Sequence, residues 1–276
     1  MIRWVGFCLF SAIAFSIVPE ARPLTFLRHV GPKLPADFQN GNRPVFIYAD
    51  NGVWDIGLEH LKFFFSEHGY SYKEIKAADI KAGILRAEVP PLLVMPGGES
   101  WVYLESLGDE GAEKILSYVR GGGAYLGICA GAFYATSHRE GGAETGEYGI
   151  GLLKGVAYDG TALGAPSFVD GMMDFSILSS AITTGIASSL KIAMFGGPSF
   201  RFSTLEATSK KVKVLARFKL FKEPGMIAFQ YGLGRAFLSG PHFEVEEPRT
   251  DWTDIVDPDS EWPLFDRVTC WLLSSC

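Results

Sequence analysis

The sequence predicts an α/β fold in which a mostly parallel central sheet has helices on both faces. Two observations predict it. Short, fully apolar runs recur through the first half of the chain, and segments with apolar residues at helical spacing lie between them. Fully apolar runs are typical of strands that are buried on both faces. Strands that alternate with helices are typical of βαβ units, which build parallel sheets.

The first half of the folded chain supplies the clearest of these elements. The expected strands are Val45–Ala49, Tyr70–Ile75, Leu92–Met95 and Ala124–Ile128. Helical spacing begins at Trp54 after the first strand, covers residues 77–86 after the second, and runs from Ala112 to Val119 after the third. Gly69 and the run of glycines after Arg120 are suited to helix ends, because glycine adopts the left-handed conformation that is common there.

The second half of the chain is richer in expected strands. They cover Gly155–Asp159, Ser189–Phe195, Val212–Phe218, Met226–Tyr231 and Arg235–Ser239. Apolar residues between Leu264 and Leu272 then indicate a closing helix. No repeat of fixed period and no low-complexity segment divides this stretch, so we expect a single domain over residues 44–276.

The N-terminal segment differs from the rest of the chain. Arg3 precedes an uncharged run from Trp4 to Val18, which is shorter than the roughly 20 residues of a membrane-spanning helix. A basic start followed by an apolar centre is typical of a secretory signal peptide. We therefore expect a signal peptide at 1–21, an arm or linker at 22–43, and export to the periplasm or the medium. An uncleaved membrane anchor and a buried N-terminal helix are the alternatives.

Composition and charge exclude some classes of partner. The chain of 276 residues has a formal net charge of −6 and no block of basic residues, which argues against nucleic-acid binding. No phosphate-binding loop of the G-x-x-x-x-G-K type and no metal-ligand spacing is present, so we expect neither a cofactor nor a metal. A small-molecule or peptide substrate remains, and a protein partner is possible. Cys270 and Cys276 could form a disulfide, which would leave Cys129 as a free thiol.

Cys129 lies in the segment Gly127-Ile128-Cys129-Ala130-Gly131, which has the pattern G-x-C-x-G at a junction between strand and helix. A nucleophile elbow needs glycines on both sides of the nucleophile so that strand and helix can approach closely. The N-terminus of the helix directs positive partial charge at the sulfur and favours the thiolate, which is the reactive form. The alternative is a small buried cysteine where strand and helix cross closely, and the pentapeptide alone does not distinguish the two interpretations.

A polar pair follows a later strand. His242 and Glu244 are two residues apart, so in an extended chain they project to the same side. Glu244 could then orient His242, and His242 could deprotonate Cys129. Earlier in the chain, Pro-Gly-Gly ends the strand at Met95. The backbone N–H groups of Gly98 and Ala130 could form an oxyanion hole, although an ordinary turn would explain these glycines as well.

Taken in order, the Pro-Gly-Gly, G-x-C-x-G and P-H-x-E motifs resemble those of the class I glutamine amidotransferase superfamily. More narrowly, residues 95–99, 127–134 and 195–200 resemble the N-terminal amidotransferase-like domain of biotin protein ligases, and the resemblance covers about residues 44–273. It implies a flavodoxin-like three-layer sandwich. It also implies that Cys129 is the nucleophile, His242 the base and Glu244 its orienting partner, with Gly98 and Ala130 as oxyanion donors.

The substrate pocket of this fold class lies outside the carboxyl ends of the parallel strands. The residues expected at its walls are Asp50, Asn51, Gly97 and Ser100, and the resemblance adds Gly196 and Gly197 at the rim.

The sequence also departs from the superfamily pattern. Its glutaminases usually have a glutamine shortly after the elbow, whereas Gly131 is followed here by Ala132-Phe133-Tyr134. This departure argues against hydrolysis of free glutamine, and we expect no ATP- or biotin-dependent ligation by this chain alone. Three functions stay open: a Cys-His-Glu amidase or hydrolase, a non-catalytic ligand-binding module, and a glutaminase subunit that serves a separate partner.

Overall fold

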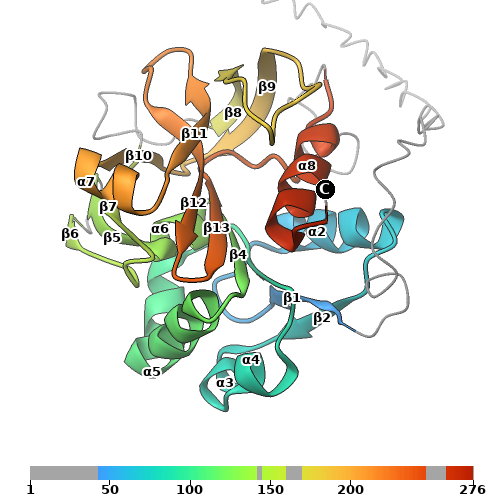
Figure 1. Cartoon of the computed structure of the whole chain (residues 1–276), viewed down its shortest axis with the longest axis vertical. Helices are drawn as coiled ribbons and strands as arrows, with labels where there is room; N and C mark the ends of the chain where they lie inside the picture. Colours follow the sequence, from blue (N-terminus) through green and yellow to red (C-terminus); the bar gives the residue numbers. More distant parts are fainter. Residues whose placement is uncertain (1–42, 142–144, 160–169, 247–258, 276) are drawn as a thin grey trace, which may run out of the picture. The chain divides into compact units, whose positions relative to one another are not determined.

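The computed structural model describes residues 43–141, 145–159, 170–246 and 259–275, all within one compact unit, Gly31–Cys276 (Figure 1). The expected signal peptide and all of the expected arm except Arg43 lie outside the described residues, as does Cys276. Cys270 is disulfide-bonded, and Cys129 is a free thiol. Within the described ranges, none of the helices has the length and apolar character needed to cross a membrane.

A nine-stranded sheet organises this unit, in the order β2-β1-β3-β4-β13-β12-β11-β8-β9. Its first part is parallel throughout and consists of β2 (Tyr72–Ile75), β1 (Val45–Tyr48), β3 (Leu92–Met95), β4 (Ala124–Ile128) and β13 (Gly234–Ser239). Every residue of β1, β3 and β4 is buried. This burial explains why these strands are continuous apolar runs and not alternating ones.

The second part of the sheet is antiparallel. It adds β12 (Pro224–Tyr231), β11 (Lys213–Phe218), β8 (Asp170–Ile177) and β9 (Ser189–Phe195). The expectation of a mostly parallel sheet was therefore wrong, and the sheet is mixed. Short connections explain the difference: only Gly232 and Leu233 separate β12 from β13, and a two-residue loop joins neighbours in antiparallel fashion, whereas a parallel pair needs a crossover of a dozen or more residues.

Helices pack on both faces of the parallel part. The helices α2 (Asp55–Glu67) and α8 (Trp262–Leu273) contribute apolar side chains to one core cluster with the odd-numbered residues Val45 and Ile47 of β1. The other cluster contains the even-numbered Phe46 and Tyr48 together with residues of α3 (Ala77–Lys81), α4 (Ile84–Glu88), α5 (Ser100–Arg120) and α6 (Ala130–Ala135). Successive strand residues face opposite sides of a sheet, so each face has its own core.

A second, four-stranded sheet has the order β10-β7-β5-β6. It consists of β10 (Ser199–Phe202), β7 (Leu153–Tyr158), β5 (Thr136–Glu140) and β6 (Gly146–Glu147), and the short helix α7 (Thr204–Ser209) follows β10. In Figure 1 these strands and α7 lie together, beside β11 and β12 of the large sheet. The sequence pattern predicted β7 within about two residues but not the other three strands.

Candidate active site

The candidate site forms where four parallel strands end side by side. The chain leaves β1 through Gly52 to Trp54, β3 through Gly97 and Gly98, β4 at Cys129, and β13 just before His242. These strands are neighbours in the sheet and run in the same direction. The first crossover runs outward from β1 to β2 and the next returns to β3, which makes this edge the switch point where ligands bind in open α/β sheets.

Cys129 occupies a strained turn between β4 and α6. Its φ of 47° and ψ of −102° are uncommon for a residue with a side chain. The turn is held by the Cys129 N–H, which donates to the carbonyl of Ser239 at 2.8 Å. A methyl group on Gly127 would approach the Gly131 carbonyl to 2.6 Å, and one on Gly131 would meet the Met95 carbonyl at 2.0 Å. The two glycines therefore permit the close approach that a nucleophile elbow requires.

His242 reaches the same place from β13. Its ring is 1% exposed, and its Nδ1 lies 2.8 Å from Oε1 of Glu244. Its backbone N–H donates to the Ala193 carbonyl at 2.7 Å, which fixes the segment against β9. Gly97 makes room for the ring, because an added methyl group there would lie 2.4 Å from its Cε1. A buried carboxylate at Nδ1 selects the tautomer in which Nε2 is left for the thiol.

The electrostatic environment favours a protonated imidazole. Burial by itself lowers the pKa of His242, but the Glu244 carboxylate and the Cys129 sulfur outweigh it through charge and hydrogen bonding, so the pKa of His242 is raised to about 10. Glu244 is fully buried, so its charge is poorly screened by water. The structure thus brings Cys129, His242 and Glu244 together in one chain of interactions.

The Cys129 sulfur has a second neighbour. It lies 3.7 Å from the carbonyl oxygen of Phe195, in the geometry of a thiol that donates a weak hydrogen bond. That bond requires the proton on sulfur, whereas the contact with His242 also suits a thiolate beside an imidazolium. The contacts of Cys129 are therefore compatible with a proton on either the sulfur or the imidazole.

A cavity of about 490 Å³ opens beside the thiol, and its lining residues are Gly52, Val53, Trp54, Gly98, Glu99, Cys129, Phe195 and His242. Trp54 and Phe195 form its aromatic walls. The Trp54 ring centroid lies 4.8 Å from that of His242 and 5.4 Å from that of Phe195. Glu99 adds a carboxylate, which accepts a hydrogen bond from Trp101 Nε1 at 3.0 Å.

The expected oxyanion donors lie in this region. Gly98 lines the cavity together with Cys129, and its φ of 137° is open to glycine alone at little cost. Ala130 is the first residue of α6, so its N–H has no acceptor within the helix. Among the described residues neither N–H donates to another group. Both are thus positioned by local backbone geometry and are available as donors.

The other expected pocket residues lie outside the cavity lining. Asp50 accepts from the N–H groups of Asn51 and Ala77, both at 2.9 Å, and the second bond caps the start of α3. Asn51 is exposed. Ser100 is buried against the hydroxyl of Tyr148 at 2.7 Å.

Gly196 and Gly197 hold the neighbouring loop. Gly196 has a φ of 68°, and a methyl group on Gly197 would meet the Gly240 carbonyl at 2.0 Å. These glycines keep the segment after Phe195 close to the segment before His242. They therefore help to position the Phe195 and His242 rings in the site.

Sequence reasoning missed both aromatic walls. The helical spacing marks Trp54 only as the start of a helix, and the apolar run marks Phe195 only as the end of a strand. Trp54 follows a parallel strand at the carboxyl edge of the sheet, and this position could have indicated that it lines the site. Phe195 arrives from an antiparallel strand, so the parallel-strand rule does not reach it. Within the described residues, no group of three or more His, Cys, Asp or Glu side chains is arranged to hold a metal ion.

Comparison with solved structures first defines the class of protein. A crystal structure of a glutamine amidotransferase superposes with a TM-score of 0.58 at 20% identity, covering 83% of this chain and 99% of that one. A putative GMP synthase component from Thermoplasma acidophilum gives a TM-score of 0.54 at 16% identity, with coverage of 84% and 96%. The chain therefore has an α/β fold like that of the glutamine amidotransferases, with a large mixed sheet and helices.

The family follows from sequence. The family model described as the N-terminal part of biotin-protein ligase matches residues 44–261, and the chain belongs to that family. A biotin–protein ligase of Schizosaccharomyces pombe is 32% identical over 238 residues, which are 81% of this chain and 37% of that protein. A protein of Chlamydia muridarum, named only as uncharacterised, is 30% identical over 218 residues, which are 72% of this chain and 80% of its own length.

Proposed function

We propose that the chain is a cysteine-dependent hydrolase that cleaves an amide or ester bond, with Cys129 as nucleophile, His242 as base and Glu244 as orienting carboxylate. One observation carries the proposal. The fully buried imidazole of His242 interacts with a carboxylate on one side and with a thiol at a strained turn on the other. This is the arrangement by which a base activates a nucleophile and is itself oriented by a third group.

The reaction follows from these positions. His242 takes the thiol proton, and the sulfur attacks the carbonyl carbon of the substrate. The oxygen becomes negatively charged and accepts hydrogen bonds from the N–H groups of Gly98 and Ala130. The carbon–nitrogen or carbon–oxygen bond then breaks, the leaving group takes the proton from His242, and a thioester remains on Cys129. Water, deprotonated by His242, attacks the thioester and releases the acid while the thiol is restored.

The walls of the cavity indicate the kind of substrate. Trp54 and Phe195 offer aromatic surface beside the thiol, and Glu99 offers a negative charge. Aromatic faces and a carboxylate together favour a substrate whose apolar part lies near a positively charged or hydrogen-bond-donating group. A small molecule or the end of a peptide fits this description, and a protein partner remains compatible with it.

The residues after the elbow distinguish this site from a glutaminase. Ala132, Phe133 and Tyr134 are buried, and none of them lines the cavity. This helix therefore offers no side chain to hold free glutamine, and a glutaminase subunit is the weaker alternative. A non-catalytic binding module on the same fold is the other alternative, and it would keep the cavity without using the thiol.

Trapping of a thioester tests the hydrolase directly. The purified chain is mixed with a panel of activated amides and esters and quenched within seconds, and the acyl adduct is located by peptide mass spectrometry. We expect an adduct on Cys129 in the wild type and strongly slowed formation in His242→Ala. Ligand binding that survives Cys129→Ser, with no adduct in the wild type and an ordinary thiol, would instead establish the binding module.

We propose two further properties on the same footing. The chain is exported, which is supported by the disulfide at Cys270, since such bonds persist mainly in oxidising compartments. Determination of the mature N-terminus after expression in the source cell tests this.

The flavodoxin-like three-layer arrangement is proposed for the parallel part of the sheet, supported by the packing of helices on both its faces.

A further inference from the structure

A larger cavity lies between the C-terminal end of α5, the end of β12 and the small sheet. Its volume is about 940 Å³, and its lining residues are Arg120, Ser137, His138, Ile150, Gly151, Lys154, Gly155, Val156, Arg201, Phe202, Ser203 and Tyr231. It shares no lining residue with the cavity beside Cys129. Its size is within the range of pockets that hold small molecules.

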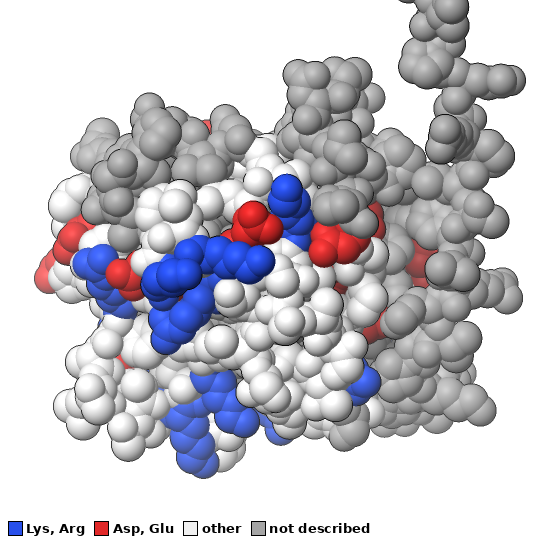
Figure 2. Space-filling model, turned by 90° about the horizontal axis from the view of Figure 1, so that it is seen from above, with Lys and Arg blue, Asp and Glu red and all other residues white. Residues whose placement is uncertain are grey.

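The charge of this cavity is its distinctive feature. Three of the lining residues, Arg120, Lys154 and Arg201, are cationic, and no lining residue is acidic, in a chain whose net charge is −6. By contrast, the face of the molecule seen in Figure 2 carries Lys and Arg side chains next to Asp and Glu side chains. The cavity is therefore a local concentration of positive charge on an acidic protein.

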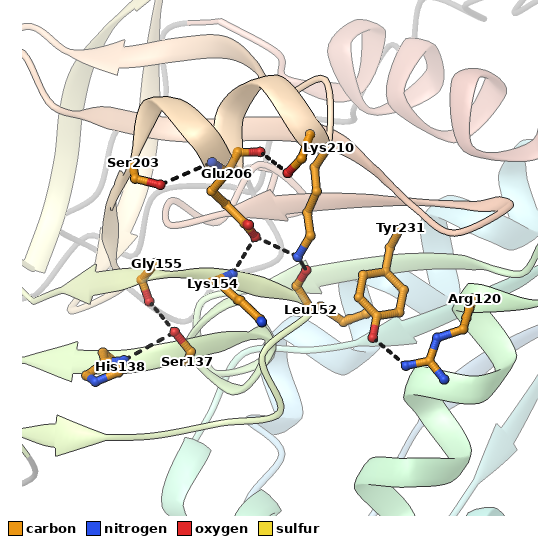
Figure 3. Close-up of polar contacts among 11 residues, drawn as sticks. Arg120, Ser137, His138, Leu152, Lys154, Gly155, Ser203, Glu206, Lys210 and Tyr231 are labelled. Carbon is orange, nitrogen blue, oxygen red and sulfur yellow. Dashed lines mark hydrogen bonds and ion pairs between the residues drawn. The ribbon is translucent and has the colours of Figure 1, made fainter.

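Neighbouring carboxylates neutralise only part of this charge. Glu206, from α7, is buried and forms an ion pair with Lys210 at 2.6 Å, and it also accepts from the Lys154 backbone N–H at 2.7 Å. Glu223 pairs with Arg201 at 2.8 Å. Figure 3 shows that Glu206 meets the backbone of Lys154 while the lysine side chain extends away from it.

Two cations remain uncompensated. Within the described part of the chain, neither Lys154 nor Arg120 forms an ion pair with a carboxylate. Arg120 is held in place by a neutral group, because its Nη2 donates to the hydroxyl of Tyr231 at 2.9 Å (Figure 3). A guanidinium that is already ordered loses less conformational entropy when it binds an anion.

We propose that this cavity binds a small molecule that carries a phosphate group next to an apolar part. A phosphate monoester has a charge of about −1.5 to −2 at neutral pH, which matches the two uncompensated cations better than a single carboxylate does. The Ser203 hydroxyl accepts from the Glu206 N–H at 3.1 Å and keeps its own proton to donate to a phosphate oxygen. The rings of Phe202 and Tyr231 provide surface for the apolar part of the ligand.

Calorimetric titration of the full chain with ADP, pyrophosphate and adenosine tests the proposal. We expect ADP and pyrophosphate to bind, adenosine to bind much more weakly, and the affinity to fall as salt is added. Lys154→Gln and Arg120→Gln should each weaken ADP binding roughly tenfold, since each removes one charge-assisted contact. Lys219→Gln is the matched control, because Lys219 is an exposed lysine outside the cavity lining, and it should bind as the wild type does.

Two results would overturn the proposal. One is the absence of binding of both ADP and pyrophosphate to the folded wild type at millimolar concentration. The other is binding that Lys154→Gln and Arg120→Gln leave unchanged, which would place the phosphate elsewhere. Lys154 and Arg120 are exposed, so both variants should fold, and a thermal denaturation curve for each verifies this.

Discussion

The cavity beside Cys129 and the cavity against the small sheet are built in opposite ways. In the one beside Cys129, the lining residue His242 and the Glu244 carboxylate behind it are 1% and 0% exposed, whereas Glu99 at the wall is exposed. The other lies against the small sheet, and Arg120 and Lys154 at its walls are exposed. A buried charge polarises its neighbours strongly, whereas exposed charges are screened by water. The first arrangement suits chemistry and the second suits reversible binding.

This difference makes the two regions separable by mutation. Changes in the first region should alter the reactivity of the thiol, and changes in the second should leave it untouched.

Glu244→Gln should have the largest effect on the thiol. It removes the buried negative charge beside His242 without changing the volume of the side chain, so the imidazolium loses its main electrostatic support. We expect the alkylation rate of Cys129 by iodoacetamide at pH 6 to fall about 100-fold, which corresponds to about 2.7 kcal/mol. The control is Glu206→Gln, which removes a buried carboxylate from the second region. Equal rates in the two variants would contradict the separation.

Gly97→Ala should come next, with an effect on both stability and reactivity. The added methyl group would lie 2.4 Å from Cε1 of His242, so the ring must move. Overpacking of this kind typically costs about 1–3 kcal/mol of unfolding free energy, which urea denaturation measures. In the exposed control Gly121→Ala, the nearest atom to the new methyl is the Ser117 carbonyl oxygen at 3.3 Å, and the loss should be clearly smaller. If Gly97→Ala kept wild-type stability and reactivity, the proposed position of His242 would be incorrect.

The candidate site could be predicted from the sequence only in part. The proximity of Cys129, His242 and Glu244 was predictable, because each lies in a short motif at the end of a strand; their catalytic roles stay a prediction. The sequence placed Trp54 at the start of a helix but did not predict that it lines the cavity, since that role depends on which strand ends lie next to one another. Asp50 follows a strand as the rule requires, yet its carboxylate turns toward the N–H of Ala77.

The strands of the fold were likewise predictable only in part. Apolar runs predicted β1, β3 and β4, because burial on both faces leaves a strong compositional signal. The strands β5 and β8 were missed. The strand β5 reads Thr-Ser-His-Arg-Glu and has only Thr136 buried, so it lacks the alternation that marks a half-buried strand. The direction of the later strands could not be deduced from their composition, because connection length and not apolar character decides it.

Glu206→Gln should have a moderate effect that is confined to stability. Glu206 joins α7 to β7 by accepting from Lys210 and from the Lys154 N–H. Hydrogen bonds to charged groups contribute about 1.5–3 kcal/mol, and glutamine retains one acceptor, so we expect a loss of about 1.5 kcal/mol in urea denaturation. Glu223→Gln is the control, since its partner Arg201 is about half exposed. An equal loss in the control would show that α7 is not anchored by this buried pair.

The pH dependence of stability should follow the pKa of His242. The pKa of His242 is raised to about 10 from an ordinary value of 6.5, so the folded protein holds this proton more tightly than the unfolded chain does. Taken alone, this group contributes stability that is present in full below about pH 6.5 and is lost as the pH rises toward 10, at up to about 1.4 kcal/mol per pH unit. Nitrogen chemical shifts of the ring should show it still protonated at pH 8. A midpoint at or below 6.5 would contradict the assignment.

The pH profile of Cys129 alkylation in the wild type tests the coupling between Cys129 and His242 most directly. Cys129 is the free thiol of the described residues, so the labelled site is readily assigned by peptide mapping. If Cys129 and His242 form a coupled pair, the alkylation rate should change by less than about threefold between pH 8 and pH 6, because His242, whose pKa is raised to about 10, stays charged beside the sulfur throughout this range. A rate that falls about tenfold per pH unit below pH 8, as it does for free cysteine, would contradict the account.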